Sequence, residues 1–422
     1  MMVKKLFFFF GFILIFTGCK STKITKEINQ HLDSDFYENQ FTGLLVINPK
    51  TNDTIFNQNS DKYFSPASNT KIVTLYTALQ FLPDSIPAFK YSVDKDTVSI
   101  LGTGDPSFLH SYFQDSTALK LGQNYAKVNL LINNITDEKL GPGWAWEDYD
   151  TYFSPERNSF PMYGNVLTVS NQDSLLVSPS VLKNKVQYSE TERPRKLNEN
   201  EFYYNPNRKR EQEIPFVTDS VLISTLWQDL LPNKVTVSNY QGEKMETIAY
   251  SIQSDSLYKR MMQKSDNHLA EQMLILASSS LSDTLSSKNI RKYVLENQLE
   301  DLKQQPRWVD GSGLSRYNLF TPMSFVQILS KLYTEIPQER LFTIFPAGGE
   351  SGTLKKYYHG KITPYIYAKS GTFSNNYSLS GYLITNSGEV LVFSFMNNHY
   401  RKSSVEIKHQ MGKVLEYLRE NY

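Results

Sequence analysis

After the first 40 residues, the hydrophobic pattern begins with a pair of short apolar runs, residues 44–47 and 54–56. A polar segment that contains a proline, residues 48–53, separates them, and this pattern predicts a strand, a turn and a second strand. Farther along, apolar side chains at three- and four-residue spacing predict a helix over residues 68–82, with Pro83 just past its end. These side chains are Ile72, Leu75, Leu79 and Leu82.

The middle of the chain, residues 90–241, has little helical spacing. Short apolar segments alternate there with glycine, proline and aspartate turns, which predicts a mostly β region. The most polar stretch, residues 181–215, is predicted to form a mobile loop. The basic triplet Arg208-Lys209-Arg210 within it is best interpreted as a solvated face.

Helical spacing returns in the last part of the chain, where helices are predicted over residues 252–278, 287–297 and 322–333. Three strand-like runs follow, at residues 365–373, 377–385 and 389–396, and Asn386-Ser387-Gly388 is a good hairpin turn between the last two. The chain ends in a predicted amphipathic helix. Its apolar face is expected to carry Val405, Met411, Val414, Leu415 and Leu418.

Strands near both ends of the chain flank this helical region. The simplest arrangement joins both sets of strands in one sheet with helices on its faces, and the middle of the chain then becomes an inserted domain. We therefore predict an α+β fold in which residues 20–89 and 242–422 build one domain and residues 90–241 form a mostly β insert.

The first 19 residues have the pattern of an export signal. Two lysines precede an apolar run, residues 6–16, that is too short to span a bilayer as a helix, and Thr17-Gly18-Cys19 follows. The only cysteine of the chain thus stands at the predicted cleavage site, where it resembles the lipidated cysteine of bacterial lipoproteins, although Phe16 replaces the usual leucine. We expect an envelope protein anchored to a membrane by lipid on Cys19. The alternative is an ordinary cleaved signal with a chance cysteine.

Composition excludes some classes of function. The formal net charge is +1, from 44 basic and 43 acidic residues, which gives no reason to expect nucleic-acid binding. The six histidines do not cluster and no Cys-x-x-Cys pair is present, so we predict neither a metal site nor a cofactor. The oligomeric state is left open.

Three short motifs carry candidate chemistry: Ser68-Asn69-Thr70-Lys71, Ser265-Asp266-Asn267 and Lys369-Ser370-Gly371-Thr372. This combination occurs in penicillin-binding proteins and class A β-lactamases. Ser-x-x-Lys also occurs at residues 92–95, 180–183 and 256–259, whereas Lys-Ser/Thr-Gly occurs once. The match at Ser68 differs from most of the others in its context, because it opens an amphipathic helix directly after the predicted hairpin.

The spacing within the first motif suits nucleophilic catalysis. Residues three apart on a helix share one face, so the Lys71 amine is predicted to lie beside the Ser68 hydroxyl. A serine needs a neighbouring base, and lysine can be that base only when burial and a nearby positive charge lower its pKa. Lys369 would supply that charge if the C-terminal strand lies beside the helix. The free N–H groups at the helix start favour an oxyanion.

The second motif suits proton transfer. Ser265 can relay a proton between Lys71 and the leaving amine. Asn267 can accept a hydrogen bond from Lys71 and donate one to the substrate amide. The third motif suits recognition of a C-terminal carboxylate, because it offers a charge and two hydroxyls. Its glycine lets a substrate backbone approach an edge strand closely.

Each motif alone has a plainer interpretation. Ser68 could be a helix N-cap, Lys71 a surface lysine, residues 265–267 a polar helix start and residues 369–371 a bulged strand. The occurrence of all three motifs in this order, on the expected types of element, favours a catalytic site.

With these motifs, the sequence resembles the penicillin-binding protein 4-type D-alanyl-D-alanine carboxypeptidases and endopeptidases, the S13 peptidases. The matching segments extend from about residue 64 to 373. Outside the three motifs they are Gly102-Thr103-Gly104-Asp105-Pro106, Gly143-Trp144, Asp310-Gly311-Ser312-Gly313-Leu314-Ser315-Arg316 with Asn318 and Pro322, and residues 349–354.

The resemblance implies a transpeptidase-like, serine β-lactamase-like fold with an antiparallel sheet between helical layers and an insert after the nucleophile helix. It implies that Ser68 is acylated with Lys71 as its base, and that backbone N–H groups of Ser68 and Thr372 form the oxyanion hole. The remaining implied roles are proton relay and substrate contact for Ser265 and Asn267, and carboxylate binding for Lys369, Ser370 and Thr372.

The resemblance also implies the ligands, which are peptidoglycan stem peptides ending in D-Ala-D-Ala and β-lactam inhibitors. It leaves carboxypeptidase and cross-link endopeptidase activity open. For residues 310–316 we expect a tight loop that shapes the cleft rather than direct catalysis. Two other functions are alternatives. One is a serine β-lactamase, which needs a base for deacylation; the sequence identifies none, and Glu271 and Glu350 stay open as candidates. The other is a catalytically silent, peptidoglycan-binding lipoprotein.

Overall fold

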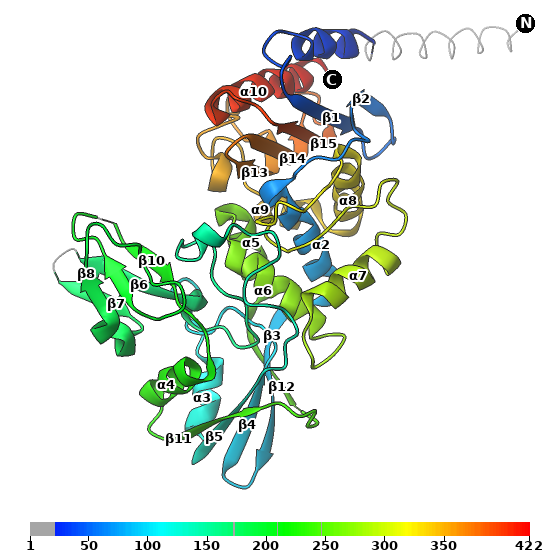
Figure 1. The fold of residues 1–422 in the computed structure, drawn as a ribbon. Coiled ribbons are helices and arrows are strands. Elements are labelled where there is room, and N and C mark those ends of the chain that lie inside the picture. The colour runs from blue at the N-terminus through cyan, green and yellow to red at the C-terminus, as the bar shows by residue number, and fades with distance from the viewer. Residues whose placement is uncertain (1–21, 172–173, 209, 246) are drawn as a thin grey trace, which may run out of the picture.

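The computed structural model describes residues 22–171, 174–208, 210–245 and 247–422. The predicted signal and Cys19 lie outside the described residues, as does Lys209 of the basic triplet. Figure 1 shows an upper part, where helices cover a sheet built from both ends of the chain, and a lower part with further sheets.

The upper sheet has five antiparallel strands in the order β13-β14-β15-β1-β2. They are β1 (Phe41–Ile47), β2 (Thr54–Gln58), β13 (Ile366–Phe373), β14 (Asn376–Ile384) and β15 (Val390–Asn398). The pairing of β1 with β15 joins Phe41 to Asn398 and Ile47 to Val392, so strands from both ends of the chain share one sheet, as predicted. The third motif lies on β13, which is an edge strand.

Helices cover both faces of this sheet. Because side chains alternate between the faces of a strand, β15 sends Val392 and Met396 to one core and Phe393 and Phe395 to the other. The first core packs against α2 (Lys71–Phe81), α5 (Ser254–Lys264), α6 (Asn267–Ser278), α7 (Ser287–Asn297), α8 (Pro322–Glu335) and α9 (Gln338–Ile344). The second packs against a helix over residues 22–32 and α10 (Ser404–Asn421).

Two helix predictions need correction. The predicted helix over residues 252–278 is two helices, because Ser265 adopts a left-handed conformation with φ 56° between α5 and α6. On α10, Val405 is 57% exposed and therefore does not belong to the apolar face, whereas Met411, Val414, Leu415 and Leu418 are buried. Helix α9 was not predicted at all. Helix α7, in contrast, has the predicted bounds.

The lower part contains a second five-stranded sheet, in the order β11-β5-β4-β3-β12, and a three-stranded sheet, in the order β10-β6-β7. Their bounds are β3 (Ser85–Asp94), β4 (Thr97–Gly102), β5 (Lys127–Ile132), β6 (Val166–Asn171), β7 (Leu175–Ser178), β10 (Gln212–Pro215), β11 (Lys234–Asn239) and β12 (Thr247–Gln253). Helices α3 (Thr117–Gln123) and α4 (Ser220–Leu230) and the pair β8 (Val186–Tyr188) and β9 (Phe202–Tyr204) complete this part. The stretch predicted to be a mobile loop therefore includes three short strands.

The division of the chain into domains stays a prediction, but its boundaries can be refined. Because β3 begins at Ser85 and β12 ends at Gln253, both strands extend beyond residues 90–241. We therefore place the insert at residues 85–253. Within the described ranges, no helix combines the length and the apolar composition needed to cross a bilayer.

Candidate active site

The three motifs meet at one cleft of about 1110 Å³ between the upper and lower parts. Ser68 enters it from the 3-10 turn η1 (Ala67–Thr70) that leads into α2, Ser265 and Asn267 from the α5–α6 junction, and Ser370 and Thr372 from β13. The fold thus brings together side chains that are up to about 300 residues apart in the sequence.

Lys71 lies directly beside Ser68, as the three-residue spacing predicts. Its Nζ is 3.0 Å from Ser68 Oγ, 2.6 Å from Asn267 Oδ1 and 2.6 Å from the backbone oxygen of Ser312. Lys71 is fully buried, so it is not the surface lysine of the plainer interpretation. Ser68 lies within η1, and the N-cap of α2 is Thr70, whose hydroxyl donates to Ala67 O instead of capping the helix.

Burial lowers the pKa of Lys71 to about 8, against the opposing effect of Asp310, Asp266 and Glu271. A lysine with this pKa is partly neutral near neutral pH and can accept the Ser68 proton. The charge of Lys369 was predicted to lower the pKa of Lys71, but it is the pKa of Lys369 that the charge of Lys71 lowers. Burial, and then the charge of Lys71, hold the pKa of Lys369 well below its ordinary value.

The second motif lies where α5 ends and α6 begins. Asp266 caps α6 by accepting from Leu269 N, and Asn267 Nδ2 donates to the backbone oxygen of Phe153 at 2.9 Å. The hydrogen bond to Ser265 Oγ comes from Lys369 Nζ, at 2.8 Å, rather than from Lys71. Ser265 is therefore bonded to the lysine of β13, and Asn267 to the lysine of α2.

Strand β13 approaches the nucleophile turn so closely that only glycine fits at position 371. A Cβ at Gly371 would lie 2.4 Å from Pro66 O, 2.8 Å from Asn69 N and 2.9 Å from Ser68 N. On the other side, Gly313 has φ +85°, and a Cβ there would lie 1.9 Å from Ala67 O. The Ala67–Ser68 backbone is thus held between two glycines, with β13 beside the Ser68 amide.

A residue outside the motifs completes the β13 side of the cleft. Thr353 Oγ1 lies 2.8 Å from Ser370 Oγ, and both residues line the cleft. Thr353 belongs to the 349–354 turn, whose sequence pattern carried no chemical role of its own. Because these residues were among the segments that resemble the S13 peptidases, that resemblance is the signal that could have pointed to the Thr353 hydroxyl.

The loop 310–316 is ordered by one buried carboxylate. Asp310 accepts from Gly313 N at 2.9 Å, Ser315 N at 2.6 Å and Asn318 Nδ2 at 2.7 Å. Trp144 of the insert donates to the same carboxylate at 2.9 Å. These contacts fit the expected loop-shaping role, and they place the Ser312 carbonyl against Lys71.

The rest of the cleft is strongly polar. Its lining includes Arg260, Lys264, Arg316, Lys402 and Lys408, together with Glu147, Asp148, Glu213 and Asp266. Among the described residues, no group of three or more histidine, cysteine, aspartate or glutamate side chains is placed to hold a metal ion. The arrangement can activate a serine and bind a polar, charged substrate.

Comparisons with known proteins point to one family. The model of the D-Ala-D-Ala carboxypeptidase 3 (S13) family matches residues 24–193 and 227–418. The D-alanyl-D-alanine carboxypeptidase DacB of Haemophilus influenzae is 28% identical over 175 residues, which cover 39% of this chain and only 36% of the relative. Penicillin-sensitive carboxypeptidase A of Dictyostelium discoideum is 23% identical over 400 residues, which cover 79% of this chain and 76% of the relative.

Solved structures show the fold. Penicillin binding protein 4 (dacB) from Haemophilus influenzae superposes with a TM-score of 0.70 at 19% identity, over 93% of this chain and 98% of that one. A predatory endopeptidase from Bdellovibrio bacteriovorus gives a TM-score of 0.52 at 16% identity, over 90% and 93% of the two chains. The predicted transpeptidase-like α+β fold is confirmed.

Proposed function

The chain belongs to the D-Ala-D-Ala carboxypeptidase 3 (S13) family of peptidases, and from this premise we propose that it cleaves D-Ala-D-Ala ends of peptidoglycan stem peptides through an ester on Ser68. The observation that carries the proposal is the Ser68–Lys71 pair, in which a fully buried amine lies 3.0 Å from the hydroxyl. The lowered pKa of this lysine, about 8, suits a base that works near neutral pH.

In the first step, neutral Lys71 takes the Ser68 proton while Oγ attacks the carbonyl carbon between the two D-alanines. The resulting oxyanion accepts hydrogen bonds from the backbone N–H groups of Ser68 and Thr372. The C–N bond then breaks, and a proton from Lys71 reaches the departing D-Ala amine through Ser265. Water hydrolyses the ester by the reverse sequence and restores the Ser68 hydroxyl.

Substrate recognition falls to the edge strand β13. Ser370 and Thr372 line the cleft and bind the terminal carboxylate, and the free edge of β13 pairs with the extended peptide. Lys369 is fully buried and supports this strand through its hydrogen bonds to Ser265 Oγ and Ser370 O. Asn267 holds the amide of the penultimate residue while its own Oδ1 accepts from Lys71. A β-lactam carries a carboxylate and a strained amide in similar positions, so it acylates Ser68 and is retained as an inhibitor.

We further propose that the protein works in the cell envelope, where its substrate is found. Lipidation of Cys19 would anchor it to a membrane, shortly before the helix over residues 22–32 that packs on the second core. Metabolic labelling with a clickable palmitate analogue, with Cys19→Ser as the control, tests the anchor. Labelling that persists in Cys19→Ser would reject it.

The test of the proposed activity is intact mass spectrometry of the full chain after incubation with benzylpenicillin. We expect one stable adduct in the unchanged chain and none in Ser68→Ala. Release of D-Ala from a peptide ending in D-Ala-D-Ala should be lost in the same variant. Cross-linked peptide dimers, offered in parallel, distinguish endopeptidase from carboxypeptidase activity.

Two results would replace this proposal. Hydrolysed penicillin without an adduct would favour a β-lactamase, and intact penicillin without an adduct would favour a silent binding protein. The position of the two candidate deacylation bases supports the peptidase. Glu271 is buried against Ser312 N and Arg157, Glu350 is exposed, and neither belongs to the described lining of the cleft.

A further inference from the structure

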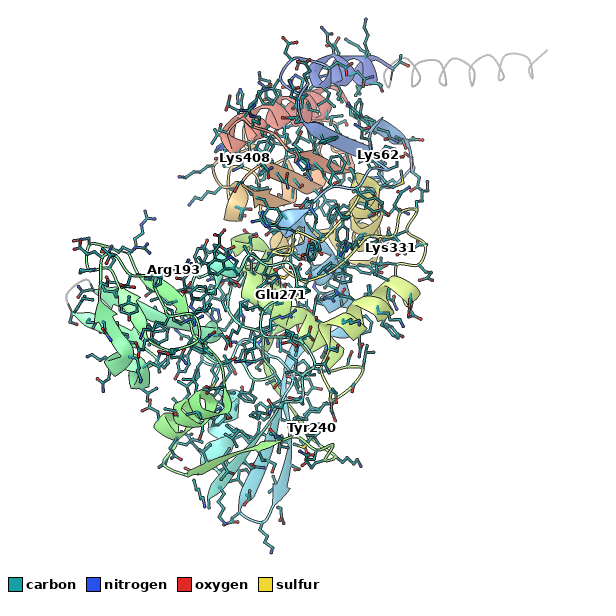
Figure 2. All side chains as sticks on the ribbon, in the orientation of Figure 1. Lys62, Arg193, Tyr240, Glu271, Lys331 and Lys408 are labelled. Atoms are coloured by element: carbon teal, nitrogen blue, oxygen red, sulfur yellow. The ribbon has the colours of Figure 1, made fainter. Side chains whose placement is uncertain are left out.

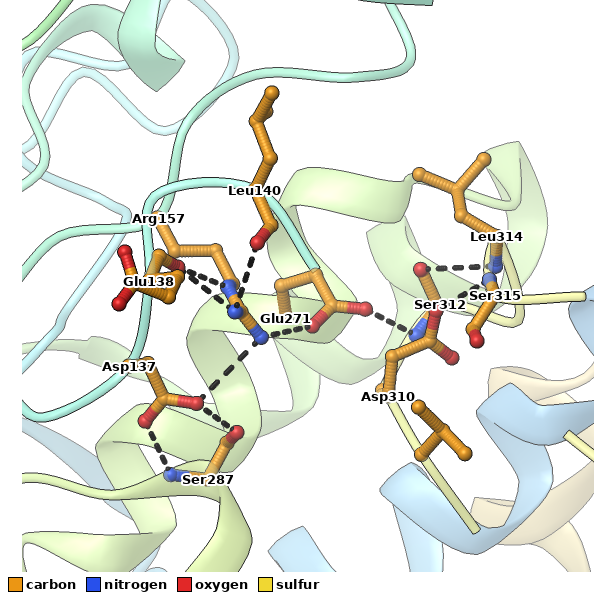
Figure 3. Close-up of polar contacts among 12 residues, drawn as sticks. Asp137, Glu138, Leu140, Arg157, Glu271, Ser287, Asp310, Ser312, Leu314 and Ser315 are labelled. Atoms are coloured by element: carbon orange, nitrogen blue, oxygen red, sulfur yellow. Dashed lines mark hydrogen bonds and ion pairs between the residues drawn. The ribbon is translucent and has the colours of Figure 1, made fainter. Parts of the chain in front are cut away.

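A buried carboxylate with no role in the chemistry above lies directly behind Lys71. Glu271 is 1% exposed and lies near the middle of the molecule, where the upper and lower parts meet (Figure 2). It belongs to α6, one turn after Asn267. Its Oε1 accepts from Ser312 N at 2.7 Å, and its Oε2 lies 3.4 Å from Arg157 Nη1 (Figure 3).

The contact with Ser312 reaches the base itself. The Ser312 N–H donates to Glu271, while the Ser312 carbonyl accepts from Lys71 Nζ at 2.6 Å. The other acceptor for Lys71 outside its own segment, Asn267 Oδ1, lies on the same helix as Glu271. Helix α6 therefore sets two of the oxygen atoms around the Lys71 amine, one directly and one through Ser312.

The contact with Arg157 reaches into the insert. Arg157 Nε and Nη2 donate to the backbone oxygen of Glu138, at 3.0 and 2.7 Å, and Nη1 also lies 3.5 Å from Asp137 Oδ1. Asp137 in turn accepts from Ser287 N at the start of α7, at 2.6 Å. Every nitrogen of this guanidinium is engaged and its side chain is 2% exposed, so its position is fixed by the insert (Figure 3).

Stability alone is a weak reason to bury such a pair. Removing a guanidinium and a carboxylate from water costs free energy that their mutual attraction often fails to recover. The charged groups around Glu271 are Arg157, Arg291 of α7 and Asp310. With Asp137 beside Arg157, two guanidinium groups therefore face three carboxylates behind the base, and Glu271 is the one that is bonded to the Ser312 backbone.

From this geometry we propose that Arg157 and Glu271 form a positioning bridge, by which the insert holds the Ser312 carbonyl and hence Lys71 in place for acylation. The inference rests on the proposed function, because it assumes that Lys71 is the base for Ser68. It assigns to the insert a part in the rate of the chemical step, in addition to its part in lining the cleft.

The first variant is Glu271→Gln, which keeps an oxygen for Ser312 N and removes the charge that faces Arg157. We expect the maximal rate of acylation by benzylpenicillin to fall about ten- to hundredfold, as small displacements of catalytic groups do, with penicillin binding changed less than about twofold. The charge of Glu271 raises the pKa of Lys71, so the acid limb of the pH–rate profile should also move to lower pH. Partial unfolding would lower the rate without moving that limb.

The second variant is Arg157→Met, which removes the insert's half of the bridge and leaves Glu271 bonded to Ser312. We expect a similar fall in maximal rate, partly restored in Arg157→Lys. The double variant should be no slower than the slower single variant, because both changes break one connection. Additive losses would show that the two residues act separately and would overturn the bridge.

A matched control is Glu156→Gln. Like Glu271, Glu156 is a buried carboxylate, but it belongs to the insert, accepts from Thr218 N and Oγ1, each at 2.7 Å, and pairs with Lys139 at 3.4 Å. We expect it to keep the acylation rate and the acid limb of the unchanged chain. An equal loss in this control would show that removing any buried carboxylate near the insert lowers the rate, which would overturn a specific role for Glu271.

All rates are measured on the full chain after circular dichroism has established that each variant is folded. If the unchanged chain forms no Ser68 adduct, the proposed function fails and the bridge fails with it. If the unchanged chain is acylated and Glu271→Gln and Arg157→Met match it in maximal rate, the bridge alone is overturned. Should Glu271→Gln fail to fold, the rates of Arg157→Met and Arg157→Lys decide the matter.

Discussion

Lys71 and Lys369 are both fully buried, and each amine is held by oxygen atoms of the protein. Lys71 donates to Ser68 Oγ, Asn267 Oδ1 and Ser312 O, and Lys369 donates to Ser265 Oγ and Ser370 O. Because burial penalises an ammonium ion and the charge of Lys71 further lowers the pKa of Lys369, the pair releases a proton far more readily than isolated lysines do.

This arrangement predicts the pH dependence of acylation. The base must be neutral, and the pKa of Lys71 is about 8, so the rate should rise about tenfold per pH unit below pH 8 and level off above it. The measurement is the second-order rate constant for benzylpenicillin acylation between pH 5.5 and 9.5. Lys71→Gln should lose both the rate and this dependence. A rate that is flat between pH 6 and 8 would exclude Lys71 as the titrating base.

A second prediction concerns His268, which follows Asn267 on α6. It is 5% exposed, neither ring nitrogen has a hydrogen-bond partner among the described residues, and burial lowers its pKa from 6.5 to about 4. The ring must stay neutral in the folded protein. Its contribution to stability is therefore full above pH 6.5 and is lost as the pH falls toward 4.

His268→Leu should therefore make the protein less sensitive to acid. Between pH 8 and pH 5 the unchanged chain should lose about 2 kcal/mol of unfolding free energy through this histidine, a loss that the leucine variant avoids. Urea unfolding at both pH values measures the difference. Equal losses in the two proteins would show that His268 titrates normally in the folded state.

At the scale of elements, the close approach of β13 to the turn η1 determines the site. It brings the Lys369–Thr372 segment against the nucleophile, and Gly371 permits it by having no side chain. Gly371→Ala should move the strand away and lower the acylation rate by about a hundredfold or more, while the protein remains folded. Acylation kinetics and thermal unfolding, measured together, test this.

A matched control for this prediction is Gly412→Ala on α10. A Cβ at Gly412 would have its nearest neighbours at 3.7 and 3.8 Å, which is ordinary contact with the Tyr358 ring. We expect unchanged acylation and about 0.5–1 kcal/mol of added stability, since alanine is a better helix former than glycine. If Gly371→Ala also keeps the full acylation rate, the close approach is not required.

The elements also explain which sequence predictions succeeded. Periodic spacing predicted the strands of the upper sheet, because their side chains alternate between the two faces of the sheet. It also predicted the bounds of α7, whose buried residues recur at three- and four-residue spacing. The break at Ser265 was indicated only by the plainer interpretation of residues 265–267 as a polar helix start, and Asp266 does cap α6 there. Apolar spacing continues from α5 into α6, and the residue that adopts the left-handed conformation is a serine rather than a glycine.

Within the site, too, the sequence predicts contacts inside one element but not contacts between distant segments. The Ser68–Lys71 contact lies inside one helical turn, so local spacing predicts it. The Ser312 carbonyl, Thr353 and the Arg157–Glu271 contact depend on how distant segments pack. A backbone oxygen has no side-chain signature, and a buried charge pair looks like two surface residues until the fold brings them together.

At the scale of the whole molecule, the lower part has a core of its own. Trp227 of α4 is fully buried there, with ring centroids of Phe108 and Phe160 at 5.4 and 5.6 Å. This cluster shares no residue with the two cores that cover the upper sheet. The Arg157–Glu271 contact and the Trp144–Asp310 hydrogen bond are among the connections between the parts.

Separate cores predict separate unfolding. Trp227→Ala should destabilise the lower part by about 3–5 kcal/mol and split calorimetric unfolding into two transitions, of which only the first is shifted. Leu274→Ala on α6 is the matched change in the upper core and should shift the second transition. A single transition lowered equally by both variants would show that the two parts unfold as one unit.

The shared sheet also fixes when this protein can begin to act. A ribosome makes the chain in order, so β1, β2 and Ser68 are complete while β13 and β15, with which they assemble, have yet to be synthesised. Until about the last tenth of the chain has emerged, Ser68 has no oxyanion hole on β13 and β1 has no partner on β15. Reactivity toward penicillin therefore arises in a single late step, and a prematurely terminated chain carries the nucleophile but not the means to use it.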